Sequence, residues 1–202
     1  MAELPARRSA LAAVINAGDF GTVPASGPGI LLAERRGLAM VQLAVAPAEY
    51  PSVAERVETT LGLVLPRAPN RAEVVRELAA LWTGPGRVLL VAPDEGGLEG
   101  ALQQALAGLE AAISGLSHAR SVIRIGGTRV RDLLAKGCGL DFHASTFAAG
   151  AAVQSTYAHI NVLLHALDDA PTVDLYVYRG FAVSLWEHLL EAALEYGCRV
   201  AG

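Results

Sequence analysis

Residues 173–197 read VDLYVYRGFAVSLWEHLLEAALEYG, and this stretch predicts a buried strand that runs directly into an amphipathic helix. The first six residues are mostly apolar, β-branched or aromatic, as in a strand with little exposed surface. Apolar side chains then recur at helical spacing, at Ala182, Leu185, Trp186, Leu189, Ala193 and Leu194. Gly197 is expected to end the helix. A strand that feeds a helix of this length is typical of an α+β fold.

The first half of the chain repeats this order. Residues 87–92 predict a short buried strand, and residues 98–116 predict a second long amphipathic helix. The apolar positions of that helix are three or four residues apart, at Leu98, Leu102, Leu106, Leu109, Ile113 and Leu116. We therefore expect an α+β fold of two similar strand–helix–strand–helix lobes packed together, over residues 37–116 and 117–202.

Weaker patterns place the remaining elements. Strands are expected at 38–45, 121–125, 152–159 and 161–167. Ser52 and Glu55 have the spacing of a capping box, which predicts a helix that ends near Gly62. Thr128 is a candidate N-cap for a helix that ends at Gly137, where a left-handed terminator is expected. Residues 72–81 have helical propensity.

The N-terminal segment differs from the rest of the chain, because Gly and Pro residues interrupt residues 1–36 repeatedly. We expect an extended N-terminal arm here, whose apolar side chains lie on another surface, either of this chain or of another chain. The alternative is a plain disordered terminus.

Composition narrows the class of protein. The chain has 202 residues, a formal charge of −4, 18% charged residues and 52% hydrophobic residues. This excludes a disordered polypeptide, and the lack of a basic block argues against nucleic-acid binding. Few charges on a small chain fit a large surface buried against a partner, although a GC-rich genome that favours Ala and Arg gives the same bias.

The sequence predicts a cytoplasmic protein with no membrane contact. No stretch approaches the roughly 20 apolar residues of a membrane span. Arg7 and Arg8 precede an apolar run that Asn16 interrupts too early for a secretion signal. Cys138 and Cys198 are expected to be ordinary cytosolic thiols.

Four sets of residues could form a chemical site, and a structural role is favoured for each. The glycine turn at 124–128 lacks the full pattern of a phosphate loop. Asp168 and Asp169 precede a proline, where Asp commonly forms turns. Cys138 and His143 share a loop without a recognisable oxyanion device. The histidines His118, His143, His159, His165 and His188 lack metal-ligand spacing. We therefore expect no catalytic, cofactor-binding or metal residue in this chain.

Residues 131–141 read RDLLAKGCGLD. This segment resembles a segment of the gamma subunits of heterotetrameric sarcosine oxidase. Residues 163–177, 181–186 and 195–197 are similar to later segments of that family. Residues 8–11 resemble its start, with Ala10 where the family has proline.

The resemblance implies a fold related to the folate-binding domain of the glycine-cleavage aminomethyltransferase, and it argues against a helix at 72–81. It also implies a complex of alpha, beta, gamma and delta subunits. That complex oxidises the N-methyl group of sarcosine to give glycine, hydrogen peroxide and a one-carbon unit for tetrahydrofolate. FAD, FMN, NAD, tetrahydrofolate and zinc are expected in the partner subunits, and the gamma chain is expected to be a non-catalytic subunit of this oxidoreductase.

Two alternatives remain open. The chain could be the gamma subunit of a related N-methyl amino acid dehydrogenase, because the matched residues do not separate the substrates. It could also be a stand-alone folate-binding protein similar to aminomethyltransferase. Such a protein needs a carboxylate for the pterin, for which Asp132, Asp141 and Asp174 are the candidates.

Overall fold

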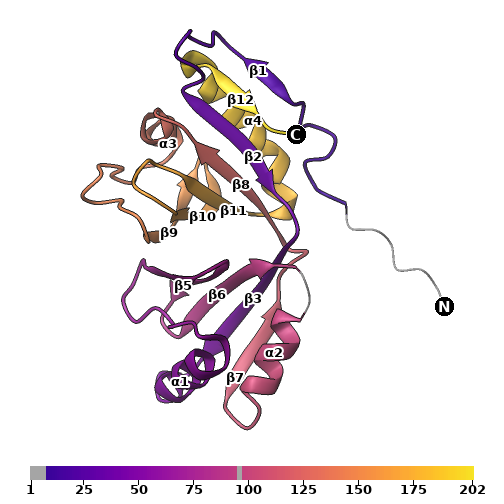
Figure 1. The fold of residues 1–202 in the computed structure, drawn as a ribbon, viewed down its shortest axis with the longest axis vertical. Coiled ribbons are helices and arrows are strands. Elements are labelled where there is room, and N and C mark those ends of the chain that lie inside the picture. Colours follow the sequence, from indigo (N-terminus) through magenta and orange to yellow (C-terminus); the bar gives the residue numbers. More distant parts are fainter. Residues whose placement is uncertain (1–7, 95–96) are drawn as a thin grey trace, which may run out of the picture.

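The computed structural model describes residues 8–94 and 97–202, and within these residues two sheets face one another (Figure 1). The smaller sheet has the order β4-β5-β6-β3-β7, and the larger has the order β1-β12-β2-β8-β11-β10-β9. Neighbouring strands are antiparallel except for β12 and β2, which are parallel.

Each sheet has its own helices. The elements of the smaller lobe are β3 (Leu38–Val45), α1 (Tyr50–Leu61), β4 (Ala72–Val75), β5 (Leu78–Gly84), β6 (Arg87–Pro93), α2 (Leu98–Ala105) and β7 (Ala111–Gly115). Those of the larger lobe are β1 (Gly18–Phe20), β2 (Ile30–Arg35), β8 (Arg120–Gly126), α3 (Val130–Gly137), β9 (Ala152–Tyr157), β10 (Ile160–Ala166), β11 (Val173–Tyr178), the 3-10 turn η1 (Arg179–Phe181), α4 (Ala182–Ala193), the 3-10 turn η2 (Leu194–Tyr196) and β12 (Cys198–Val200).

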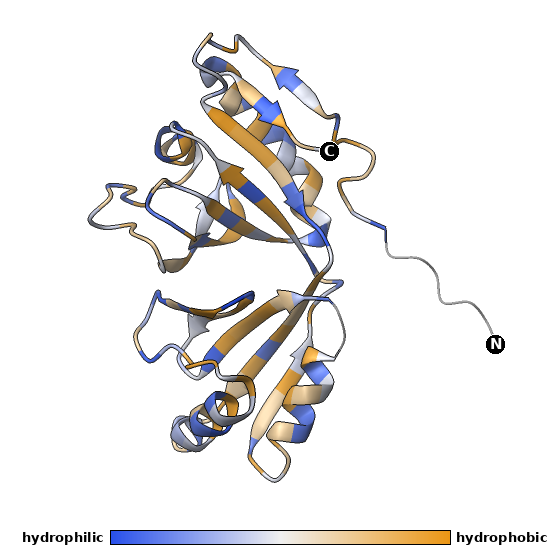
Figure 2. Cartoon of the chain, in the orientation of Figure 1, coloured by the Kyte–Doolittle hydropathy of each residue, from blue (hydrophilic) through white to orange (hydrophobic). Residues whose placement is uncertain are grey.

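The described residues form three apolar cores, one inside each lobe and one between the lobes. One core lies between the larger sheet and helices α3 and α4, and a second lies between the smaller sheet and helices α1 and α2. The third core contains only strand residues within the two lobes, among them Leu81, Leu89, Leu163 and Tyr176, and it joins the sheets face to face. Strands buried on both faces lose the alternation of a half-exposed sheet, and Figure 2 shows them mostly hydrophobic.

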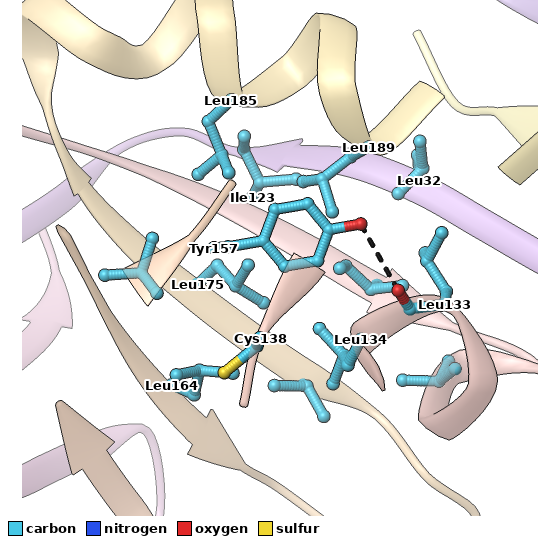
Figure 3. Packing of buried hydrophobic residues seen from close by; sticks show 14 of the residues in the cluster. Leu32, Ile123, Leu133, Leu134, Cys138, Tyr157, Leu164, Leu175, Leu185 and Leu189 are labelled. Atoms are coloured by element: carbon cyan, nitrogen blue, oxygen red, sulfur yellow. Dashed lines mark hydrogen bonds between the residues drawn. The ribbon is translucent and has the colours of Figure 1, made fainter. Parts of the chain in front are cut away.

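Tyr157 is the centre of packing in the larger lobe (Figure 3). Its phenolic hydroxyl donates a 3.2 Å hydrogen bond to the carbonyl oxygen of Leu133 on α3. A Cβ at Gly137 would lie 2.6 Å from Cζ of the Tyr157 ring. Gly137 is therefore needed for close packing, and its expected role as a left-handed terminator is wrong, because Cys138 ends the helix in an extended conformation.

Most predicted strands and the last helix are confirmed. The strands at 38–45, 87–92, 121–125 and 173–178 correspond to β3, β6, β8 and β11. Helix α4 buries five of the predicted side chains, namely Ala182, Leu185, Trp186, Leu189 and Ala193. Gly197 follows η2 with a φ of 66°.

The helix expected at 98–116 is wrong. Helix α2 ends at Ala105, Gly108 turns the chain with a φ of 83°, and β7 then pairs with β3. Leu109, Ala111 and Ile113 still pack against the core of the smaller lobe. The apolar spacing at the end of this stretch does not distinguish a helix from a strand, because alternate residues of a strand also face one side of the sheet.

Residues 72–81 form the β4–β5 hairpin, in which Arg76 has a φ of 53° at the turn, so their helical propensity is not realised, as the family resemblance implied. Two expected helix caps are wrong. Helix α1 begins at Tyr50 with Glu49 as N-cap, so Ser52 lies inside the helix and caps nothing. Likewise Arg129, rather than Thr128, is the N-cap of α3. Pro51 in the first turn of α1 has the fixed φ that suits a helix start.

The N-terminal segment is not an arm separate from the lobes. Strand β1 pairs with β12, and β2 lies between β12 and β8 in the larger sheet. Leu11, Ile30 and Leu32 are buried in the core of that lobe. The expected arm at 1–36 is therefore corrected for residues 18–20 and 30–35, which complete a sheet, while residues 1–7 lie outside the described residues.

Candidate functional site

A cavity of about 370 Å³ lies between the two sheets. Strands of both lobes line it, together with the turn of the β4–β5 hairpin. Its polar lining residues are Arg35, Arg76, Glu77, Arg124, His165, Asp174 and Tyr176. The cavity has the size of a small-molecule site and is lined by the buried side chains of His165 and Asp174, so it is the candidate functional site.

Arg124 and Asp174 form the central polar contact of this cavity. They are directly opposite one another on β8 and β11. Nε and Nη2 of Arg124 donate hydrogen bonds of 2.7 and 2.8 Å to the two carboxylate oxygens of Asp174. The hydrogen bond to Asp174 raises the pKa of Arg124. Both oxygens of this buried carboxylate are thus held by a guanidinium that stays charged.

His165 lies on β10, beside this pair, and is only 2% exposed. Burial lowers its pKa from 6.5 to about 4, which outweighs the opposing effect of Asp174. The imidazole is therefore neutral at pH 7. Its Nδ1 has no hydrogen-bond partner among residues 8–94 and 97–202.

The arrangement can orient a polar molecule but offers no activated base. Asp174 is neutralised by Arg124, and burial also raises the pKa of Tyr176, which stays protonated. A general base needs a free acceptor with a pKa near the working pH. The cavity therefore resembles a buried polar interface between the lobes more than a reaction centre.

The segment 131–141 has a structural role that accounts for its side chains. Nη1 of Arg131 donates to the carbonyl oxygens of Phe142 and Phe147, at 2.6 and 3.0 Å. Asp141 accepts from the backbone N–H of His143 and from the hydroxyl of Thr146. The guanidinium and the carboxylate thus fix the loop that follows α3.

A family model described as sarcosine oxidase, gamma subunit family, matches residues 46–195, which is more than half of the chain. The chain belongs to this family. Its members include a sarcosine oxidase gamma subunit of an Arthrobacter species, 37% identical over 105 residues, or 52% of each protein. The gamma subunit of Corynebacterium sp. strain P-1 is 36% identical over 90 residues, 45% of this chain and 44% of that one. The chain spans about half the length of the curated relatives it matches.

Superposition on solved structures shows that the structural similarity covers nearly the whole of this gamma-family chain. A chain of heterotetrameric sarcosine oxidase from Corynebacterium sp. U-96 superposes with a TM-score of 0.83 at 26% identity, over 94% of this chain and 96% of that one. Aminomethyltransferase T of the glycine cleavage system from Bartonella henselae gives a TM-score of 0.63 at 15% identity, over 87% of this chain and 48% of that one. The predicted family and the predicted folate-binding-like α+β fold are confirmed.

The structure does not bring together the other residues of this gamma-family chain that the sequence offered as candidates. Cys138 is buried, and its Sγ lies 3.4 Å from Oγ of Ser155. His143 is exposed, and its Nδ1 bonds to Ser145. Asp132 pairs with Arg129 at the surface, so of the three candidate carboxylates only Asp174 lies in the cavity.

The two candidate turns have the expected structural roles. Oδ1 of Asp168 accepts from the backbone N–H groups of Ala170 and Thr172, which closes the turn. At Gly127 the φ is 110°, and a Cβ would lie 2.4 Å from the carbonyl oxygen of Gly29. That carbonyl directly precedes β2 and also accepts a 3.1 Å hydrogen bond from the backbone N–H of Arg129, so this N–H at the start of α3 is already bonded.

Metal binding finds no support in the described residues. No group of three or more His, Cys, Asp and Glu side chains within residues 8–94 and 97–202 could hold a metal ion. His159 lies exposed in the β9–β10 turn, away from buried His165. In the same part of the chain no helix is long and apolar enough to cross a membrane.

The cluster of Arg124, His165 and Asp174 was not found from the sequence as a unit. The available signal was an ionisable residue within each of three largely apolar strands. A buried charge in such a strand needs a partner, and neighbouring strands supply it. The strand order β8-β11-β10, which decides the neighbours, is not encoded locally.

Proposed function

We propose that this chain is a non-catalytic gamma subunit of a heterotetrameric sarcosine oxidase. The observation that carries the proposal is the superposition, with a TM-score of 0.83 over 94% of the chain, on a chain of such an oxidase. In this proposal the alpha, beta and delta subunits complete the complex, which acts in the cytoplasm.

The polar groups of the inter-sheet cavity support a non-catalytic role. Both oxygens of Asp174 are bound by Arg124, and His165 is neutral at pH 7. The buried thiol of Cys138 contacts Ser155 instead of a histidine. These contacts stabilise the fold and leave the described candidates without the nucleophile–base contact that covalent catalysis requires.

The proposed reaction takes place in the partner subunits. Sarcosine is oxidised at its N-methyl group, and the products are glycine, hydrogen peroxide and a one-carbon unit that tetrahydrofolate accepts. FAD, FMN, NAD, tetrahydrofolate and zinc are assigned to the partners. The gamma chain contributes by packing against them.

Co-expression with the neighbouring open reading frames tests this proposal. We expect the chain to copurify stoichiometrically with a large folate-domain chain, a flavin oxidase chain and a small cysteine-rich chain. The purified complex should oxidise sarcosine and release hydrogen peroxide, while the chain purified alone carries no flavin. Recovery of a stable monomer that ignores the other chains would count against a subunit role.

A stand-alone folate-binding protein is the second candidate, because the fold is shared with aminomethyltransferase T. The cavity does not fit the pterin well, since the carboxylate that would bind it is already held at two points by Arg124. We expect no heat signal when tetrahydrofolate is titrated into the isolated chain. Micromolar binding that Asp174→Asn abolishes and Asp132→Asn preserves would favour this alternative.

A gamma chain of a related N-methyl amino acid dehydrogenase is the third candidate, because family membership does not separate the substrates. Oxygen uptake by the assembled complex, measured with sarcosine and with other N-methyl amino acids, distinguishes them. Hydrogen peroxide formed with sarcosine supports the oxidase. Activity that requires an artificial electron acceptor and prefers another amine supports the dehydrogenase.

A further inference from the structure

A basic pocket lies at the junction of the two lobes. Figure 1 shows where the chain passes from one lobe to the other. It is formed by the connection of β2 to β3, the connection of β7 to β8 and the start of η1. We call the following residues the junction surface: Arg8, Arg36, Arg120, Tyr178, Arg179 and Phe181.

Positive charge dominates this pocket although the chain as a whole has a formal charge of −4. Arg8, Arg36, Arg120 and Arg179 line it, together with Arg35. Among its described lining residues Glu34 supplies the carboxylate, and that carboxylate is bound to Ser9 and to Arg36. The pocket therefore keeps an excess of positive charge.

Two of these guanidinium groups have no carboxylate partner among the described residues. Nη2 of Arg179 donates to the carbonyl oxygen of Arg8 at 2.7 Å. The guanidinium of Arg120 lies over the ring of Tyr178, 4.7 Å from its centroid, and its Nε is buried without a hydrogen-bond partner. A buried N–H donor without an acceptor costs free energy, and no carboxylate of the described residues balances the positive charge of this guanidinium.

Exposed aromatic rings lie next to these arginines. Tyr178 is 49% exposed and Phe181 is 56% exposed, and they flank Arg179 in sequence. Arginine and aromatic residues are enriched in protein–protein interfaces and dominate their binding energy. The juxtaposition favours a protein partner over a free anion.

The size of the pocket points to the same kind of occupant. Its volume is about 140 Å³, which is below the range of about 300–1,000 Å³ for small-molecule sites. A cofactor does not fit, whereas a single acidic side chain does. Duplex nucleic acid is disfavoured because its binding typically uses about 6–10 phosphate contacts along a longer basic surface.

We propose that the junction surface binds an acidic segment of a partner subunit, with an Asp or Glu carboxylate inserted between Arg120 and Arg179. This inference rests on the proposed function, because it assumes an assembly, and it names the chemistry of one contact. The rings of Tyr178 and Phe181 pack against the apolar atoms of the same segment.

The proposal is tested by letting variant and wild-type chains compete for incorporation into the complex. Tagged variant and untagged wild-type chains are co-expressed with the other subunits, and mass spectrometry of the purified complex gives their ratio. Arg36→Glu/Arg179→Glu reverses two exposed charges and should be depleted about tenfold or more. The control Arg67→Glu/Arg87→Glu makes the same change in net charge at exposed positions outside the junction surface, and it should assemble like the wild type.

The outcomes separate the two proposals. Equal incorporation of both double variants into a complex that contains the wild type would overturn the acidic contact while leaving the subunit role intact. Failure of the wild type to assemble would overturn both. Arg120→Gln removes charge without reversing it, and its depletion, with an unchanged circular dichroism spectrum, separates loss of contact from loss of fold.

Photo-crosslinking identifies the occupant directly. A benzoylphenylalanine at exposed position 181 should crosslink to a peptide of another subunit that contains Asp or Glu. A crosslink to nucleic acid, to a second copy of this chain or to a segment without acidic residues would contradict the proposal.

Discussion

Arg124 and Asp174 lie directly opposite one another on adjacent strands of the larger sheet and are joined by two hydrogen bonds, of 2.7 and 2.8 Å. The pair faces the inter-sheet cavity rather than bulk solvent, and Asp174 is 4% exposed. Arg199 on β12 and Asp19 on β1 form a second cross-strand pair of the same type, with 2.7 and 2.9 Å bonds, and both of these side chains are exposed. The molecule thus contains a buried pair and a matched exposed one.

Breaking the buried pair should destabilise the fold. Arg124→Met leaves the Asp174 carboxylate buried without its partner, and the free energy of unfolding should fall by about 3 kcal/mol. The double variant Arg124→Met/Asp174→Leu should recover most of that loss, because it removes both charges together. Urea denaturation followed by circular dichroism measures the two values.

The exposed pair provides the control. Arg199→Met removes the same chemical contact between two exposed side chains, and water solvates the remaining charge of Asp19. A loss as large as that of Arg124→Met would contradict the view that burial makes the first pair important.

His165 should make stability depend on pH. Its pKa is about 4 in the folded chain against 6.5 for an ordinary histidine, so the unfolded chain binds more protons between these values. The contribution of His165 is complete above pH 6.5, declines as pH falls to 4, and amounts to about 3 kcal/mol. Asp174 and Arg124 lie beside the imidazole, and Arg76 and Glu77 line the same cavity from the other lobe.

The difference between wild type and His165→Gln isolates this effect from carboxylates that titrate at lower pH. Free energies of unfolding measured from pH 7.5 to pH 4 should decline less steeply for His165→Gln. His188→Gln, on the exposed face of α4, should keep the wild-type slope. Parallel curves for wild type and His165→Gln would show that this histidine does not titrate with a lowered pKa.

Gly137 should tolerate no side chain. In Gly137→Ala the new Cβ meets the Tyr157 ring at 2.6 Å, and moving the ring disturbs its hydrogen bond to Leu133. We expect a loss of about 1–3 kcal/mol in the free energy of unfolding. At Gly139, two residues further along the chain, a Cβ would meet no heavy atom within 4 Å, so Gly139→Ala should lower the free energy of unfolding far less. Similar losses at both positions would argue against the ring contact.

The two thiols should resist alkylation in the folded chain. Burial raises the pKa of Cys198 to about 11, so little reactive thiolate is present at pH 8, and Cys138 is also buried. Iodoacetamide should label neither within minutes, and both should react in urea. A cysteine placed at exposed Ser184 gives the rate of an accessible thiol, and labelling of Cys198 at that rate would refute the prediction.

Local sequence patterns correctly predicted the helices and strands whose apolar residues and terminating residues all lie in one continuous stretch. Helix α4 carries its apolar stripe and its Gly197 terminator in one stretch, and β3, β6 and β8 are apolar runs bounded by turn residues. The prediction of a helix at 98–116 failed at its C-terminal end, where a helix and a strand would bury the same apolar residues. Ile113 continues the helical spacing of Leu102, Leu106 and Leu109, yet it packs against the core as a strand residue, and only the pairing of β7 with β3 decides its conformation.

By itself the sequence determined the α+β class, the family and the absence of a recognised catalytic motif, because apolar periodicity and the segment 131–141 are local properties of the chain. The tertiary structure alone decided that Ile30–Arg35 completes the larger sheet, that Arg124, His165 and Asp174 meet, and that Arg120 and Arg179 share one pocket. The reason is physical: strand order and lobe packing depend on contacts between residues far apart in the chain, and these contacts determine which charges are buried together.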